Sequence, residues 1–253
     1  MIDLHCHLLP GVDDGSKSVD RSVSVLRRMA EHGITAVCLT PHFEASRAEH
    51  GIPAAHDEAF ESLRPAAPAV VALHRGVELM LDRPFPPAAA ADRRLTLGGS
   101  RFLLVEFSTF IASTAARNAL AHLARLGLVP VLAHPERYAS CTPAVVADWK
   151  GAGALMQVDA TTVFTPGVRG ARARALLAEG LADIMAADNH GDGRLISTAF
   201  QALSEQGAVE QADLLLRANP AAILADGKPA PVEPFTLKQS LLSRLRQLFQ
   251  PED

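Results

Sequence analysis

Cysteine, clustered positive charge and long apolar segments are all scarce in this chain of 253 residues. Its three cysteines, Cys6, Cys38 and Cys141, form no C-x-x-C pair, so we expect reduced thiols rather than a disulfide framework. The formal net charge is −4 and basic residues form no cluster, which argues against a large nucleic-acid footprint. No apolar run has membrane-spanning length, and the N-terminus lacks the pattern of a signal peptide. We therefore expect a cytoplasmic protein that does not bind nucleic acid.

The remaining composition, 48% hydrophobic and 21% charged, is that of an ordinary globular protein. Apolar segments of strand length alternate with helical patterns, such as Val19, Val23, Leu26 and Met29 before Gly33. We expect strands at residues 2–4, 34–39, 70–73, 77–79, 102–105, 128–132, 155–158 and 181–186. This alternation predicts an α/β fold with a parallel sheet, either open and doubly wound or closed into a barrel, and about seven strands favour the barrel.

The chain is expected to divide into one barrel domain, residues 1–225, and a C-terminal part, residues 226–253. Residues 44–56 form the longest irregular stretch and predict a loop over the site. Within the C-terminal part, a Pro-rich connection leads to an amphipathic helix at residues 237–249. That helix is expected to pack on the barrel, and a contact with a membrane surface or a partner is the alternative.

A His-x-His motif, His5 and His7, ends the first predicted strand. Because side chains alternate along a strand, both imidazoles lie on one side of it. The acidic pair Asp13 and Asp14 follows in a Gly-bounded turn, and imidazoles with carboxylates can hold Zn, Mn or Fe. The motif alone does not decide between a metal site and a structural role.

Further potential ligands follow other predicted strands: His42, Glu78, Glu106, His134, Asp188 and His190. In a parallel barrel the carboxyl ends of the strands share one face, where catalytic residues collect. Singly, each could cap a loop or a helix. Jointly they favour a metal centre, because burying several carboxylates without cations is strongly unfavourable. The other histidines are expected to be structural: His32, His50, His56, His74 and His122.

These segments, with the motifs Gly-Val-Asp-Asp-Gly at residues 11–15 and His-Pro-Glu-Arg at residues 134–137, resemble the PHP (polymerase and histidinol phosphatase) superfamily. Within it, the chain looks most like the bacterial metal-dependent protein-tyrosine phosphatases of the CpsB or YwqE type, associated with capsule and exopolysaccharide synthesis. The resemblance covers residues 1–225. It implies a distorted (β/α)7 TIM-like barrel, two to three metal ions and phosphatase activity.

The resemblance also implies roles for single residues. One metal would be held by His5, His7, Glu78 and Asp188, a second by Glu106 and His134 with Glu78 bridging, and a third by Asp14, His42 and His190. Arg137 matches the phosphate-binding arginine, and His42 is a second catalytic candidate for poor leaving groups. Asn189 stands where the family usually has a small residue. Arg194 is a substrate-binding candidate on a looser match, because the stretch Gly-Asp-Gly-Arg-Leu at residues 191–195 only loosely resembles the Asn…Arg-Pro stretch of the family.

Three functions stay open at this point. The first is removal of phosphate from the tyrosine-rich tail of a bacterial tyrosine kinase that controls polysaccharide export. The second is a phosphoesterase for a small molecule such as histidinol phosphate, and the third is a non-catalytic metal-binding module, against which the intact ligand set argues. The chain has one tyrosine, so a phosphotyrosine substrate would be another protein. Mn, Fe and Zn all accept this mixture of nitrogen and oxygen ligands.

Cysteine chemistry is not expected, because thiol-based tyrosine phosphatases need the C-x5-R motif. The positions six residues after the three cysteines hold Val12, Glu44 and Ala147. We predict that Cys6→Ser and alkylation of all thiols leave phosphatase activity on a phosphotyrosine peptide unchanged. Loss of turnover on alkylation, with the fold intact by circular dichroism, would contradict this prediction.

Overall fold

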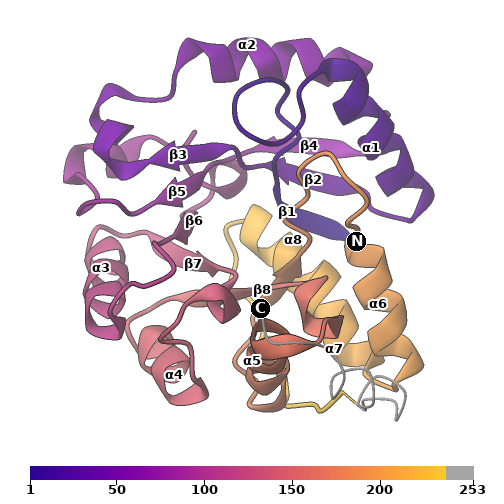
Figure 1. The fold of residues 1–253 in the computed structure, drawn as a ribbon. Coiled ribbons are helices and arrows are strands. Elements are labelled where there is room, and N and C mark those ends of the chain that lie inside the picture. The colour runs from indigo at the N-terminus through magenta and orange to yellow at the C-terminus, as the bar shows by residue number, and fades with distance from the viewer. Residues whose placement is uncertain (238–253) are drawn as a thin grey trace.

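The computed structural model describes residues 1–237, and its strands form two parallel sheets. The smaller sheet has the order β1 (Ile2–Cys6), β2 (Ala36–Leu39) and β4 (Ala72–Arg75). The larger sheet consists, in order, of β3 (His42–Glu44), β5 (Glu78–Met80), β6 (Phe102–Glu106), β7 (Val129–Ala133), β8 (Leu155–Asp159) and β9 (Ile184–Ala186). Figure 1 shows these strands in the middle of the molecule with helices around them.

The two sheets are parts of one barrel whose second and third strands are each interrupted. β3 resumes the course of β2 after Thr40 and Pro41, and β5 resumes that of β4 after Gly76 and Val77. Pairing continues across the breaks, because the Gly76 N–H donates to the Leu39 carbonyl (3.1 Å) and the Glu78 N–H to the Pro41 carbonyl (3.0 Å).

An isolated parallel bridge between Cys6 and Asn189 connects the first strand to the segment after the last. The described strands therefore occupy seven positions around a distorted barrel, which confirms the predicted fold class. The breaks also bring two potential ligands together, since His42 pairs with Glu78 in register at the start of β3 and β5.

Helices cover the outside of the barrel (Figure 1). They are α1 (Val19–Glu31), α2 (Ala54–Leu63), α3 (Ser113–Arg125), α4 (Pro143–Gly151), α5 (Gly167–Ala178), α6 (Ile196–Glu205), α7 (Val209–Asp213) and α8 (Asn219–Leu224). Short 3-10 turns lie between some of them, and a π-helical turn, Leu214–Ala218, joins α7 to α8. α1 begins where the Ser18 side chain accepts a hydrogen bond from the Arg21 N–H (3.2 Å), and it buries the predicted apolar stripe. Among the described residues, no helix is long and apolar enough to cross a membrane.

The barrel interior below the site is apolar. Phe102 and Leu104 of β6 pack with Val131 and Ala133 of β7 and with Ile184 of β9, so alternate residues of separate strands meet inside the barrel. The next alternate position on β6 is Glu106, where the interior changes from apolar to ionisable. On β6 the polar side chain thus lies at the carboxyl end of the strand.

Some sequence predictions were wrong at their boundaries. Residues 44–56 are not irregular, because a 3-10 helix, Ala45–His50, and the first turn of α2 occupy most of them. Burial of Ala45, Ala48 and His56 holds these turns against the rest of the protein. The third predicted strand lies two residues later than expected, since Val70 is exposed and β4 begins at Ala72. The predicted helix at 237–249 lies, beyond Leu237, outside the described residues.

The extended segment after α8 is anchored by Asn219, the buried first residue of that helix. Its amide donates to the carbonyls of Asp183 (2.8 Å) and Ala230 (2.9 Å) and accepts from the Ala230 N–H (2.8 Å). The Asn219 side chain thus connects the residue directly before β9 to the extended segment that follows α8.

We predict that Asn219→Ala lowers the free energy of unfolding by about 2–3 kcal/mol, because it leaves buried backbone groups without partners. Urea denaturation followed by circular dichroism measures this. The matched control is Asn118→Ala on the exposed face of α3, for which we expect a change within about 0.5 kcal/mol. Equal effects of the two substitutions would refute the anchoring role of Asn219.

Candidate metal centre

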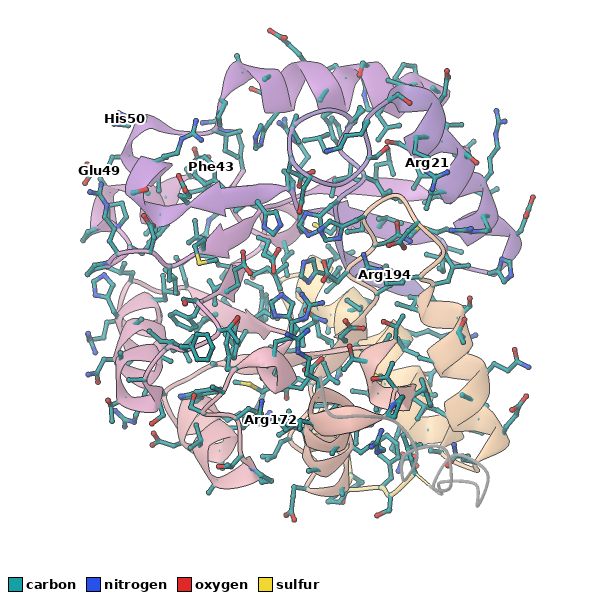
Figure 2. All side chains as sticks on the ribbon, viewed as in Figure 1. Arg21, Phe43, Glu49, His50, Arg172 and Arg194 are labelled. Atoms are coloured by element: carbon teal, nitrogen blue, oxygen red, sulfur yellow. The ribbon has the colours of Figure 1, made fainter. Side chains whose placement is uncertain are left out.

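The potential ligands predicted from the sequence converge at the carboxyl end of the barrel. Within residues 1–237, their nitrogen and oxygen atoms form three groups: His5, His7, Glu78 and Asp188; His42, Glu78 and Glu106; and His7, Asp14, His42 and His190. His134 contacts Glu78 and Glu106 and completes the set. Figure 2 shows Arg194 near the centre of the barrel, whereas Glu49 and His50 lie at its periphery. The histidines expected to be structural lie outside these groups.

The innermost group is buried. The Nε2 atoms of His5 and His7 lie 3.1 Å apart. Glu78 Oε2 is 3.2 and 3.3 Å from these two nitrogens, and Asp188 Oδ1 is 3.3 and 3.2 Å from them. Two imidazoles and two carboxylates therefore point at one position, with the donor mixture that first-row transition metals accept.

Glu78 connects this group to the second one. Its Oε1 lies 2.9 Å from His134 Nε2, and its Oε2 lies 3.1 Å from His42 Nδ1. Glu106 Oε1 is 3.2 Å from the same His42 nitrogen, and Glu106 Oε2 is 3.9 Å from His134 Nε2. One buried carboxylate thus contacts both groups through Oε2 and reaches His134 through Oε1.

The third group faces solvent. Asp14 Oδ1 lies 3.4 Å from the Nε2 atoms of both His42 and His190, and the Asp14 side chain is 70% exposed. The rings of His7 and His190 stack with centroids 4.0 Å apart. A ligand from solution would therefore meet this group first.

Two of the predicted ligands have an unusual backbone. His134 has φ of 35° and Asp188 has φ of 49°, in the left-handed region that non-glycine residues rarely adopt. Such conformations persist where the surroundings enforce them, and they are concentrated at functional sites. Here they turn the chain sharply after β7 and β9, so that both side chains reach the centre of the barrel.

The structure adds a residue that sequence reasoning missed, Gln157, and gives a role to Asp13 of the acidic turn. Asp13 Oδ2 is 2.8 Å from His7 Nδ1, and Gln157 Oε1 is 2.9 Å from His5 Nδ1. Each bond leaves Nε2 of its histidine facing the cluster, as outer partners of metal-binding histidines do. A signal existed for Gln157, a polar residue at an inward position of the apolar strand β8.

Arg137 lies at the rim and is held by two carboxylates. Its Nη2 donates to Asp188 Oδ2 (2.5 Å) and to Asp159 Oδ2 (3.0 Å). Asp159, which sequence reasoning also missed, is buried and is fixed through its other oxygen by hydrogen bonds from Thr161 and Thr162. The guanidinium is therefore oriented while its side chain remains 28% exposed.

Arg194 approaches the same aspartate from the other side. Its Nη1 lies 3.8 Å from Asp188 Oδ2, its Nη2 lies 3.1 Å from His190 Nδ1, and its Nε donates to Asp192 (2.8 Å). Two guanidiniums thus flank Asp188 at the solvent side. This arrangement can bind an anion above the cluster.

The pKa shifts in the site indicate that its buried carboxylates need positive charge nearby. Burial by itself would raise the pKa of Glu78, yet His5, then His134 and His42, hold that pKa well below its usual value. Burial opposes the charged form of His42, but hydrogen bonds to Glu106 and Glu78 raise its pKa to about 10. The carboxylates thus stay ionised only beside positive charge, which a metal ion also provides.

One orphaned oxygen supports the fit to a metal. Asp188 Oδ1 is buried and has no hydrogen-bond partner among the described residues. It points instead at the two Nε2 atoms of the innermost group. A buried acceptor without a donor is costly, and coordination of an ion would satisfy it.

The thiols take no part in this arrangement. Cys6 lies between the two histidines, but its Sγ donates to the Cys38 carbonyl (3.3 Å) on the opposite side of β1. The cysteines are buried and unpaired, and burial raises the pKa of Cys38 to about 12. Such thiols are poor nucleophiles.

Comparison with known proteins decides the family. The family model for capsular polysaccharide synthesis, CpsB/CapC, matches residues 1–225. The chain belongs to the CpsB/CapC family. This result confirms the resemblance seen in the sequence.

Two curated proteins illustrate the relationship of this CpsB/CapC member to others. The tyrosine-protein phosphatase YwqE of Bacillus subtilis is 31% identical over 140 residues, 54% of this chain and 55% of YwqE. The tyrosine-protein phosphatase CpsB of Streptococcus pneumoniae is 27% identical over 246 residues, 89% of this chain and 99% of CpsB.

Solved structures agree with the family and the fold. A structure from a study of YwqE and CpsB, described there as metal-dependent tyrosine phosphatases, matches with a TM-score of 0.78 and 25% identity, over 94% of this chain and 100% of that one. A variant of the organophosphorus hydrolase of Deinococcus radiodurans matches with a TM-score of 0.51 and 16% identity, over 88% of this chain and 92% of that one. The second match bears on the fold alone.

We predict that Glu78→Gln is the most damaging carboxylate substitution, because Glu78 contacts two of the groups at once. Metal content, measured by elemental analysis, should fall, and kcat/KM on a phosphotyrosine peptide should drop at least about 100-fold. The control is Glu49→Gln, an exposed position at the periphery (Figure 2). Normal metal content with near-normal turnover in Glu78→Gln would leave Glu78 without a role at the centre.

Proposed function

We propose that this CpsB/CapC member is a metal-dependent protein-tyrosine phosphatase. The observation that carries the proposal is the sharing of buried Glu78 between groups of imidazoles and carboxylates, in which the neighbouring ligand Asp188 is flanked by two guanidiniums. The names of its relatives YwqE and CpsB support the same activity. A non-catalytic module would have no need of arginines aimed at the cluster.

The proposed ligands are His5, His7, Asp14, His42, Glu78, Glu106, His134, Asp188 and His190, holding two to three ions of Mn, Fe or Zn. When bound, such ions activate a water molecule, neutralise phosphate charge and stabilise the leaving oxygen. Glu78 and Asp188 hold the innermost position, and Asp13 and Gln157 fix the orientation of His7 and His5. The chain thereby keeps the ligand atoms in place before a substrate arrives.

Arg137 and Arg194 bind the phosphoryl oxygens in this proposal. A guanidinium offers paired N–H donors that match two phosphate oxygens, and these bonds strengthen as charge shifts during the reaction. Asp159 keeps Arg137 at the rim. A phenolate leaves readily, with a pKa near about 10, so little help from an acid is needed.

His42 has two proposed roles, as ligand and as proton donor for poorer leaving groups. Its Nδ1 faces Glu78 and Glu106, whereas its Nε2 faces Asp14. The nitrogen that holds an ion cannot donate a proton. Ligation through Nδ1 alone would leave Nε2 for proton donation.

The proposed substrate is a phosphotyrosine in another protein, specifically the tail of a bacterial tyrosine kinase that regulates capsule or exopolysaccharide synthesis. Tyr138, the only tyrosine, is buried, and its hydroxyl donates to the Ala133 carbonyl (3.1 Å). The exposed outer group suits a phosphate carried by a protein. We place the activity in the cytoplasm, in keeping with the unpaired thiols. For the predicted 237–249 helix, which beyond Leu237 lies outside the described residues, a peripheral membrane contact stays the alternative to packing on the barrel.

The direct test compares hydrolysis of a phosphotyrosine peptide with that of histidinol phosphate, in metal-free and manganese-loaded protein. We expect manganese-dependent turnover of the peptide and far slower turnover of histidinol phosphate. Faster hydrolysis of histidinol phosphate would favour a small-molecule phosphoesterase. Full activity of metal-free protein, verified by elemental analysis, would refute the metal-dependent mechanism.

We predict that Arg137→Ala reduces kcat/KM on the phosphotyrosine peptide by roughly 10²- to 10³-fold, or about 3 to 4 kcal/mol. Metal content and folding should be preserved. Arg137→Lys should restore activity only partly, because lysine keeps the positive charge but lacks the paired N–H donors of a guanidinium. Arg125→Ala, at an exposed position on α3, is the control. An Arg137→Ala variant as active as this control would leave Arg137 as a salt-bridging residue.

A further inference from the structure

The loop between β9 and α6 carries three residues of the site, Asp188, His190 and Arg194. Its fold is set from inside by Asn189, which is fully buried. The Asn189 Oδ1 accepts hydrogen bonds from the N–H groups of Gly191 (2.8 Å) and Asp192 (3.3 Å), and its Nδ2 donates to the Arg194 carbonyl (2.5 Å). Asn189 therefore holds the loop in its conformation.

Two arginines of α1 hold the same loop from outside. Arg21 Nε donates to the Gly191 carbonyl (2.5 Å), and Arg28 Nη2 donates to the Asp192 carbonyl. Figure 2 shows Arg21 on α1 beside this loop. Neither arginine is among the residues that contact the cluster. Their bonds go to backbone carbonyls, so they act on the loop itself and do not depend on its side chains.

The loop also lies tightly against the segment that follows β1. The His7 N–H donates to the Asn189 carbonyl (2.7 Å). A Cβ atom added at Gly191, whose φ is +79°, would lie 3.3 Å from the Ser16 Cα. The loop that carries His190 is thus set directly against the loop that carries Asp14, and these two residues belong to the solvent-facing group.

We propose that Arg21, together with Arg28, is a positioning residue that latches the 189–194 loop and so fixes His190 and Arg194 opposite Asp14. The proposal rests on the proposed phosphatase function. Asp188 is less dependent on the latch, because Arg137, in the 3-10 turn after β7, holds it independently (2.5 Å). Loss of the latch therefore weakens the solvent-facing group and the phosphate contact of Arg194, and spares the innermost group.

The test uses the full chain with Arg21→Ala, Arg21→Lys and the control Arg27→Ala, an exposed arginine of the same helix. Amide hydrogen exchange in metal-free protein reports on the loop, and titration with manganese alone reports on the ligand groups. In Arg21→Ala we expect faster exchange confined to residues 189–194 and about tenfold weaker binding of the most weakly held ion. Arg21→Lys should recover part of both, and Arg27→Ala should match the parent.

Kinetics on a phosphotyrosine peptide at saturating manganese separate positioning from general damage. Because manganese then fills the groups while Arg194 stays displaced, KM should rise severalfold and kcat should change less. Parent-like loop exchange and manganese binding in Arg21→Ala would overturn the latch, and so would exchange that accelerates throughout the barrel strands. If the parent protein proved inactive on phosphotyrosine, the proposed function would fail, while exchange and titration would still decide the latch.

Discussion

Carboxylates buried side by side need positive charge between them, and this constraint organises the whole carboxyl end of the barrel. Glu78 and Asp188 are almost fully buried, and the same two imidazole nitrogens lie within 3.3 Å of both. Each carboxylate is ionised only because cationic groups surround it. The interruptions of the second and third barrel strands serve this arrangement, because they set His42 and Glu78 opposite each other at the start of β3 and β5.

The same constraint extends outward to the groups that would meet a substrate. Asp188 divides its oxygens, one toward the histidines and the other toward Arg137, so the proposed metal position and the guanidinium are coupled through one side chain. Asp159 fixes the guanidinium from behind. A phosphate bound by Arg137 and Arg194 would lie directly over the ligand groups, which is the geometry that phosphomonoester hydrolysis needs.

The fold class and the ligand residues could be predicted from the sequence, because both depend on local alternation and on strand ends. Glu106 and His134 end apolar segments, and a parallel barrel brings such ends together. Hydrogen bonds between distant segments left no comparable signal. The role of Asp159, the bonds from Arg21 and Arg28 to the 189–194 loop, and the breaks after Leu39 and Arg75 depend on partners many residues away. Residues 44–56 were wrongly predicted to be a loop, because their buried alanines do not form the periodic pattern of large apolar residues by which a helix is recognised in a sequence.

The central claim is that Glu78 lies between metal ions at the carboxyl end of the barrel. Diffraction data collected at the manganese absorption edge from crystals of manganese-loaded protein test it most directly. The account predicts anomalous peaks on both sides of the Glu78 carboxylate, one beside His5 and His7 and one beside Glu106 and His134. An active, manganese-loaded protein with no anomalous peak next to Glu78 would contradict it.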